Sequence, residues 1–124
     1  MPSDKKVLII EDDRFLSSLI KARLEKEGFA ALQVFNGEEA FQFFKQNKPD
    51  LIILDLILPK VAGFEVLEAI SLDPNLNKVP VIILSNLAQE ADVEKARRFG
   101  AVEYFVKIRV SIDDLVNKIK NVLK

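Results

Sequence analysis

The sequence predicts an α/β domain, a doubly wound, five-stranded parallel sheet with helices on both faces. Two observations lead to this fold class. Five short apolar runs alternate with five amphipathic stretches along the 124 residues, as repeated βα units require. Three of these runs are continuously apolar, which is typical of strands covered on both faces, whereas the second and fifth also contain polar residues.

The predicted elements alternate from the first strand to the last helix. The predicted strands are Val7–Ile10, Ala31–Phe35, Leu51–Leu54, Val79–Leu84 and Val102–Val106. The predicted helices are Arg14–Glu27, Gly37–Gln46, Gly63–Ser71, Gln89–Phe99 and Ile112–Leu123. Asn36 with Glu39 and Ser111 with Asp114 have the spacing of capping boxes at helix starts. A glycine follows the first and fourth helices, where a left-handed residue ends many helices.

The polarity of the strands also predicts their order. Gln33 in the second strand and Glu103 and Tyr104 in the fifth suit the edges of a sheet, and the three apolar strands suit its centre. The flavodoxin-like order 2-1-3-4-5 meets this requirement with ordinary right-handed crossovers. The strand order then reverses between strands one and three, and ligands bind beside such a point at the carboxyl ends of the strands.

Composition excludes several classes of function. A net charge of −1 argues against direct nucleic-acid binding, which needs a clustered positive surface. The chain has no Cys and no His, so thiolate, zinc-thiolate and histidine-based chemistry are excluded. Its longest apolar stretch, Leu51–Leu58, is too short to cross a bilayer, and the N-terminus does not resemble a signal peptide. We expect a cytoplasmic protein with no membrane partner, and a single domain over residues 1–124.

Charged and hydroxylic residues follow four of the predicted strands and should meet at one edge of the sheet. They are Glu11, Asp12 and Asp13 after the first strand, Asp55 after the third, Ser85 after the fourth and Lys107 after the fifth. Converging carboxylates repel one another, and Mg²⁺ with oxygen ligands is the natural counter-charge. With a lysine and a hydroxyl nearby, the edge suits in-line phosphoryl transfer to a carboxylate nucleophile, Asp55.

Each of these residues also has a purely structural interpretation. Asp13 is expected to cap the first helix. Ser85, taken alone, suits a cap for the fourth helix, and Lys107, taken alone, suits a solvated surface position. Asp55 is harder to explain in this way, because a charge directly after four apolar residues is costly unless it is paired.

These residues resemble the receiver domain of bacterial two-component response regulators, and the resemblance covers Lys5 to Leu123. The acidic pair matches Glu11-Asp12, and the acceptor with its loop matches Asp55-x-x-x-Pro59-x-x-x-Gly63. The remaining positions of the motif match Ser85, Tyr104 and Lys107, and Ser85 and Lys107 lie 30 and 52 residues after Asp55. We expect no output domain, as in a stand-alone, chemotaxis-regulator-like receiver or in a receiver excised from a longer protein.

The resemblance implies roles for these residues. Asp12 and Asp55 would ligate Mg²⁺, with Glu11 assisting partly through water and the Ile57 carbonyl completing the protein ligands. Lys107 would pair with the phosphoryl oxygens. Ser85 would move toward the phosphoryl group, and Tyr104 would change rotamer behind it. The donor would be a histidine kinase or a histidine phosphotransfer protein, and the protein would catalyse only its own phosphorylation and dephosphorylation.

The resemblance also implies an output surface formed by the fourth helix, the fifth strand and the fifth helix, for an output protein that the sequence does not name. The fourth helix is mixed in charge and the fifth is basic toward its end. For any one of these charges the simpler interpretation is a solvated helix face.

Two positions depart from the family pattern. Ile108 follows the lysine where the family usually has proline, often after a cis peptide, and Asn86 follows Ser85 where a small residue is common. We expect a trans Lys107–Ile108 peptide, because a non-proline cis bond costs about 3–4 kcal/mol.

Two other functions fit the same fold. One is a pseudo-receiver that acts as an interaction module and never carries phosphate, although the complete acidic site argues against it. The other is a flavodoxin-like electron carrier, but Glu11, Asp12 and Asp13 stand where a flavin phosphate would need a glycine- and hydroxyl-rich loop.

Overall fold

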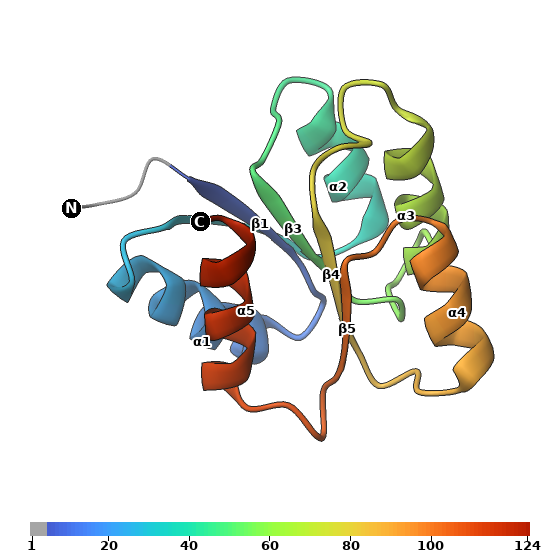
Figure 1. Cartoon of the computed structure of the whole chain (residues 1–124). Coiled ribbons are helices and arrows are strands. Elements are labelled where there is room, and N and C mark those ends of the chain that lie inside the picture. Colours follow the sequence, from blue (N-terminus) through green and yellow to red (C-terminus); the bar gives the residue numbers. More distant parts are fainter. Residues whose placement is uncertain (1–4) are drawn as a thin grey trace.

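A computed structural model describes residues 5–124 and shows the predicted parallel sheet in the order β2-β1-β3-β4-β5 (Figure 1). The strands are β1 (Lys6–Ile10), β2 (Ala30–Val34), β3 (Leu51–Leu54), β4 (Val81–Ser85) and β5 (Glu103–Val106). The helices are α1 (Arg14–Lys26), α2 (Gly37–Phe44), α3 (Gly63–Leu72), α4 (Glu90–Arg98) and α5 (Ile112–Val122). Among the described residues, no helix is both long enough and apolar enough to cross a membrane.

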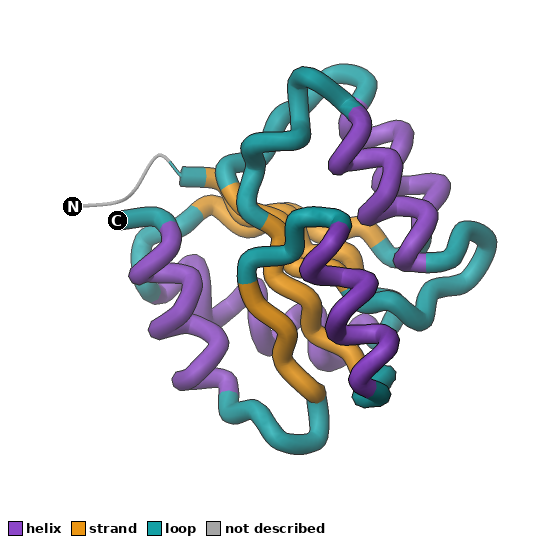
Figure 2. Tube along the Cα trace, turned by 45° about the vertical axis from the view of Figure 1, so that its right-hand side comes forward, coloured by secondary structure: helices purple, strands orange, loops and turns teal. Residues whose placement is uncertain are grey.

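The helices cover both faces of the sheet, as predicted. Helices α1 and α5 lie on one face, and α2, α3 and α4 lie on the other (Figures 1 and 2). Successive residues of a strand point to opposite faces. In β1, Val7 and Ile9 therefore pack with α1 and α5, whereas Leu8 and Ile10 pack with α2, α3 and α4. Each central strand thus contributes to two apolar layers, one on either side of it.

The predicted positions of the strands in the sheet are confirmed by their burial. Every residue of β3 and β4 is buried, and so is β1 after its first residue. Strand β2 mixes buried, partly buried and exposed residues, and all four residues of β5 are only partly buried. This is the difference expected between central and edge strands.

The observed ends of the elements lie within two residues of the predicted ones, and several coincide with them. The fourth strand begins at Val81 instead of Val79, because the Val79 N–H donates to the Leu76 carbonyl at 2.9 Å and Pro80 has no N–H to donate. The same strand ends one residue later than predicted, at Ser85, whose carbonyl accepts from the Lys107 N–H at 3.0 Å. A residue of the candidate site therefore belongs to the sheet itself.

Side-chain caps fix three of the helix starts. Asp13 caps α1 as predicted, since its Oδ1 accepts from the Leu16 N–H at 3.1 Å. Asn36 caps α2 by accepting from the Glu39 N–H at 2.9 Å, and Ser111 caps α5 in the same way. The Glu39 carboxylate returns to the N–H just before Asn36 and not to Asn36 itself, so this capping box is displaced by one residue. The caps hold the loops that leave the carboxyl ends of the strands.

Glycines meet two different needs in this fold. Gly28 and Gly100 end α1 and α4 in the left-handed conformation, with φ of 94° and 96°. Gly63, at the start of α3, permits a close approach: a Cβ there would lie 2.3 Å from Leu56 Cα and 2.5 Å from the Asp55 carbonyl oxygen. The start of α3 is thereby packed directly against the backbone that carries Asp55.

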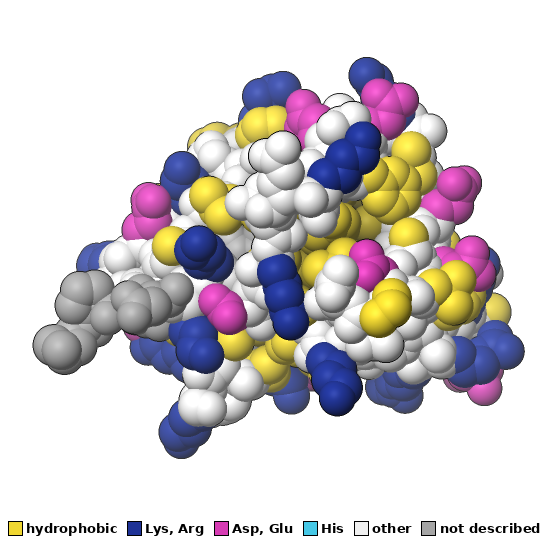
Figure 3. Space-filling view, turned by 90° about the horizontal axis from the view of Figure 1, so that it is seen from above, with side chains coloured by type: hydrophobic (Ala, Val, Ile, Leu, Met, Phe, Trp, Pro, Cys, Tyr) yellow, Lys and Arg dark blue, Asp and Glu magenta, His cyan; other side chains and the backbone are white. Residues whose placement is uncertain are grey.

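The end of the molecule formed by the amino ends of the strands is drawn in Figure 3. Basic and acidic side chains are interspersed on this face with apolar ones between them, and no large area of one charge is visible. The residues picked out in the sequence lie at the other end, where the strands finish.

Candidate functional site

Asp55 directly follows the last residue of β3, at the carboxyl end of that strand. Its N–H donates to the Ile10 carbonyl at 3.0 Å, so its backbone continues the ladder between β1 and β3. Asp55 is only 3% exposed. The acid is therefore held by the central strands beside the point where the strand order reverses.

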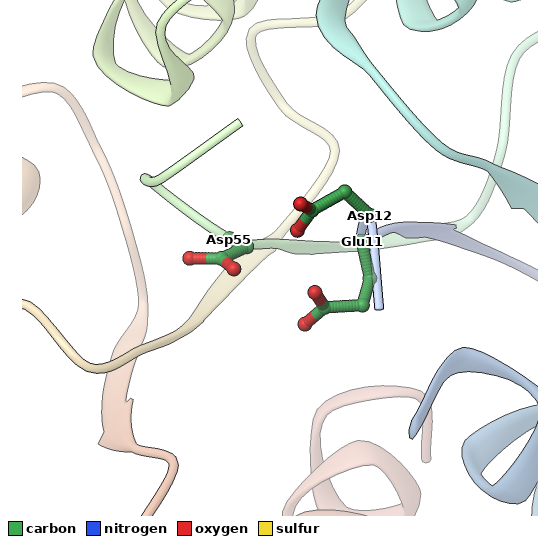
Figure 4. Close-up of side chains that lie close together, drawn as sticks. All are labelled: Glu11, Asp12 and Asp55. Atoms are coloured by element: carbon green, nitrogen blue, oxygen red, sulfur yellow. The ribbon is translucent and has the colours of Figure 1, made fainter. Parts of the chain in front are cut away.

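Three carboxylates converge at this point. Oxygens of Glu11, Asp12 and Asp55 lie within 4.8 Å of one another. In Figure 4 the Glu11 and Asp12 side chains, from the end of β1, point toward the side on which Asp55 lies. Glu11 is buried and Asp12 is exposed, so the cluster has one side closed by protein and one side open to solvent.

Lys107 is the cation of this cluster. Its Nζ lies 2.6 Å from Asp55 Oδ2 and 2.7 Å from Glu11 Oε1, and its side chain is only 17% exposed. The interpretation of Lys107 as a solvated surface lysine is therefore wrong. Burial alone would lower the pKa of Lys107, but its contacts with Asp55 and Glu11 outweigh burial and the pKa is raised. The lysine stays charged and attached to the cluster.

Backbone N–H groups fix the remaining oxygens of the two buried carboxylates. Asp55 Oδ1 accepts from the Ile57 N–H at 3.0 Å, and Glu11 Oε2 accepts from the Asp13 N–H at 3.0 Å. Each carboxylate is thus held between a backbone donor and the ammonium of Lys107. Both side chains are oriented before any ligand arrives.

The donor set fits a hard divalent cation. One ammonium faces three carboxylates, which leaves an excess of negative charge. Glu11 Oε1 is, within residues 5–124, the single buried side-chain oxygen or nitrogen that makes no hydrogen bond of regular geometry. Carboxylate oxygens of this kind, with an open side for water, are the ligands that Mg²⁺ prefers. The residues able to hold the ion are Glu11, Asp12 and Asp55.

Ser85 is fully buried and lies on the same edge, in the last position of β4. Helix α4 begins only at Glu90, after Gln89, so the interpretation of Ser85 as its cap is wrong. Instead, Ser85 Oγ accepts from the Leu87 N–H at 3.3 Å. The Ser85 hydroxyl is therefore hydrogen-bonded to the loop that joins β4 to α4.

Tyr104 contacts the same loop from β5. Its hydroxyl donates to the Leu87 carbonyl at 2.5 Å, and its ring packs against the apolar layer on the α4 side of the sheet. Burial raises the pKa of Tyr104 to about 12, with contributions from Asp92 and Asp55. Leu87 therefore contacts Ser85 through its N–H and Tyr104 through its carbonyl, a link that the sequence reasoning missed. The sequence feature that could have indicated this link is that Leu87 lies two residues after Ser85.

The peptide after Lys107 is trans, as predicted. No peptide in the described part of the chain is cis, so the trans prediction for Lys107–Ile108 is confirmed. The Ile108 N–H, which a proline would lack, donates to Asn86 Oδ1 at 3.2 Å. The two departures from the family pattern thus contact each other, and nothing in the sequence periodicity indicated this.

The electrostatics of Glu11 lead to a prediction about stability. Burial raises its pKa from 4.5 to about 7, against the opposing effects of Lys107 and the Asp13 N–H, and Asp55 adds to the rise. Between these two pH values the folded protein binds a proton that the unfolded chain has lost. The free energy of unfolding of the metal-free protein should therefore fall as pH rises from about 4.5 to about 7.

Urea unfolding in the presence of a chelator at pH 5 and pH 8 measures this effect. Glu11→Gln should remove most of the decrease, because the amide cannot ionise. Glu94→Gln, at an exposed position on α4, is the matched control and should keep the slope of the parent protein. An unchanged slope in Glu11→Gln would show that Glu11 does not titrate in this range.

Comparison with known proteins finds relatives over nearly the whole length of the chain. The family model described as "Response regulator receiver domain" matches residues 7–120. The polar-differentiation response regulator DivK of Brucella anthropi is 32% identical over 119 residues, which cover 96% of this chain and 96% of that protein.

Two solved structures are similar over nearly the same span. The Mn(2+)-bound form of response regulator Rcp1 is 30% identical with a TM-score of 0.82, over 95% of this chain and 91% of that one. The phosphorylated cyanobacterial phytochrome response regulator RcpA is 31% identical with a TM-score of 0.83, over 97% of this chain and 91% of that one.

Proposed function

Because the chain belongs to the response regulator receiver domain family, we propose that it is a phosphoryl-accepting switch with Asp55 as the acceptor. One observation carries this proposal: Asp55 is nearly buried, paired with Lys107 at 2.6 Å and placed within an oxygen-rich cluster. A purely structural buried carboxylate needs only one cationic partner. Asp55 has such a partner in Lys107, but it also lies beside the carboxylates of Glu11 and Asp12.

The proposed reaction is an in-line transfer from a phosphohistidine of a histidine kinase or a histidine phosphotransfer protein. A carboxylate oxygen of Asp55 attacks phosphorus, a P–O bond forms and the P–N bond of the donor breaks, with the electron pair leaving on the imidazole. The Ile57 N–H and Lys107 hold the carboxylate in place for the attack. Lys107 then exchanges part of its contact with the acids for the incoming phosphoryl oxygens.

We assign Mg²⁺ to the carboxylate cluster as the required ion. Asp12, Asp55 and the Ile57 carbonyl would hold it directly, and Glu11 would hold it partly through water. When bound, the ion supplies positive charge for the phosphoryl oxygens and offsets the repulsion among the acids. The related Rcp1 structure is of an Mn(2+)-bound form, and the related RcpA structure is phosphorylated, which supports both parts of the proposal.

Incubation of the purified protein with acetyl phosphate and Mg²⁺ tests the proposed function. Intact-mass measurement should show one phosphoryl adduct that is stable in acid and labile in base, and a chelator should prevent its formation. A receiver domain that is known to accept phosphate serves as the parallel control. If the control is modified and this protein is not, the pseudo-receiver alternative replaces the proposal.

The proposed output surface is formed by the edge strand β5 together with α4 and α5, which lie on opposite faces of the sheet on either side of β5 (Figure 1). Helix α4 is held weakly: it has no side-chain cap, and Ala96 is its one buried residue. Helix α5 is fixed more firmly, because three of its residues are buried and its Asp113 pairs with Arg23 of α1 at 2.6 Å. We infer that α4 and the loop before it are the parts that move.

Ser85→Ala should separate phosphorylation from this movement. The phosphoryl group biases the surface only through contacts that differ between the two states, and Ser85 provides one of them. The variant should still accept phosphate on Asp55, but its output response should be weakened. In this variant the Leu87 N–H loses the Ser85 hydroxyl that accepts its hydrogen bond. The link from Ser85 through Leu87 to Tyr104 is thereby broken.

Chemical shifts measured with and without beryllofluoride, a phosphoryl mimic, check this prediction. In the parent protein, changes should extend from the Asp55 loop to Tyr104 and α4. In Ser85→Ala they should shrink at Tyr104 and α4 while remaining around Asp55. Equal changes in both proteins would rule out Ser85 as the link.

A further inference from the structure

The hydrogen-bond ladder between β4 and β5 continues beyond the two strands. Their last paired residues are Ser85 and Val106, and the Lys107 N–H then donates to the Ser85 carbonyl at 3.0 Å. One residue further on, the Ile108 N–H donates at 3.2 Å to Asn86, but to the side-chain oxygen Oδ1 instead of the backbone carbonyl. A side-chain amide therefore adds one more step to the ladder.

This added step needs both of the residues that depart from the family pattern. A proline at position 108 would have no N–H to donate, and a small apolar residue at position 86 would have no oxygen to accept it. Ile108 and Asn86 are each exposed, so packing does not explain the pair. Their contact joins the loop that follows Ser85 to the loop that follows Lys107.

Lys107 carries the first of the two donors of this extension, and the next residue, Ile108, carries the second. Its ammonium reaches Asp55 and Glu11 from the end of a long side chain, so the placement of Nζ depends on where its backbone is held. The Ser85 carbonyl fixes the N–H of Lys107, and Asn86 fixes the N–H of the next residue. After Lys107, the Arg109 and Val110 N–H groups donate back to the Val106 carbonyl and close a turn. The bond to Asn86 is the hydrogen bond that ties this turn to the loop after β4.

We propose that Asn86 is a positioning residue for phosphoryl transfer: through the Ile108 N–H it holds the backbone of Lys107, and so aims the ammonium at the acceptor. This inference rests on the proposed function of Asp55. Asn86 itself need not touch the phosphoryl group. Its effect should appear in the rate of transfer, because misplacement of a charged group in the transition state lowers the rate.

The rate of phosphorylation by acetyl phosphate at saturating Mg²⁺ and saturating donor measures this effect. Asn86→Ala should be slower than the parent protein by about three- to tenfold, the range expected for the loss of one hydrogen bond. Ile108→Ala is the matched control, since it removes the exposed apolar side chain but keeps the N–H. It should react at the rate of the parent protein.

A double-mutant cycle separates the hydrogen bond from any other effect of Asn86. Ile108→Pro removes the donor, so adding Asn86→Ala to that variant should change the rate no further, whatever Ile108→Pro does alone. If Asn86→Ala slows the reaction equally in the Ile108→Ala and Ile108→Pro backgrounds, Asn86 acts in some other way and the inference is overturned.

Two further measurements distinguish positioning from a purely structural role. Hydrogen exchange of the Ile108 amide should be faster in Asn86→Ala, while the urea midpoint of the whole protein should change little because the bond is exposed. A lower midpoint with an unchanged phosphorylation rate would overturn the inference and leave the proposed function standing. Absence of an adduct on the parent protein would instead overturn the proposed function, and this inference with it.

Discussion

Asp55→Asn should accept no phosphoryl group from acetyl phosphate under conditions in which the parent protein gains one. The substitution keeps the size of the side chain and one oxygen near the Ile57 N–H. It replaces the anionic oxygen that faces Lys107 and that would attack phosphorus, and an amide is a poor nucleophile. The expected effect is loss of the adduct to below detection in intact-mass spectra.

Asp13→Asn is the matched control for this experiment. Asp13 is an acid close to the site, but its side chain caps α1, and asparagine caps helices equally well. The control should therefore be phosphorylated at the rate of the parent protein. An adduct on Asp55→Asn, mapped by peptide analysis to another acid, would show that the acceptor has been misassigned.

Asp12→Asn should have the second largest effect, on the binding of Mg²⁺. Asp12 is the exposed member of the carboxylate cluster and therefore the one that an incoming hydrated ion meets first. Removing a direct carboxylate ligand should weaken Mg²⁺ binding by at least about tenfold, equivalent to about 1.4 kcal/mol. Phosphorylation at low Mg²⁺ should fall with it.

Titration with Mg²⁺, followed by the backbone amide shifts around Asp55, measures the change in affinity. The same titration of Asp13→Asn controls for the loss of one negative charge near the site. If Asp12→Asn binds Mg²⁺ and accepts phosphate as the parent protein does, Asp12 is not a ligand. High Mg²⁺ should restore part of the rate of Asp12→Asn, whereas it should restore nothing in Asp55→Asn.

Much of the fold could be predicted because it depends on burial and on local hydrogen bonds. The continuous apolar runs of β1, β3 and β4 identified the central strands, and the polar residues of β2 and β5 identified the edges. Parallel strands end at a common edge, so the sequence also indicated which charged residues would meet there. The error at Val79 came from a turn that apolar pattern does not reveal.

The unpredicted part of the site consists of contacts that depend on loop conformation. The sequence indicated that Lys107 would be near Asp55, but not that it would also pair with Glu11 at 2.7 Å. Nor did it indicate the bonds of Leu87 with Ser85 and Tyr104. Periodicity describes which face of an element is buried, whereas these contacts depend on the path that the chain takes between elements.

The alternation of side chains along the central strands has a consequence for how the protein unfolds. Since β1 and β3 each supply residues to both apolar layers, loss of either strand from the sheet disrupts both layers at once. Unfolding should then be a single cooperative event, with no stable half-structured form. Asp55 directly follows a strand held in this way, so its acceptor geometry persists for as long as the native state does. The loop after Ser85 contributes only the partly buried Leu87 to one of these layers, so it can change conformation at a much smaller cost to the global stability.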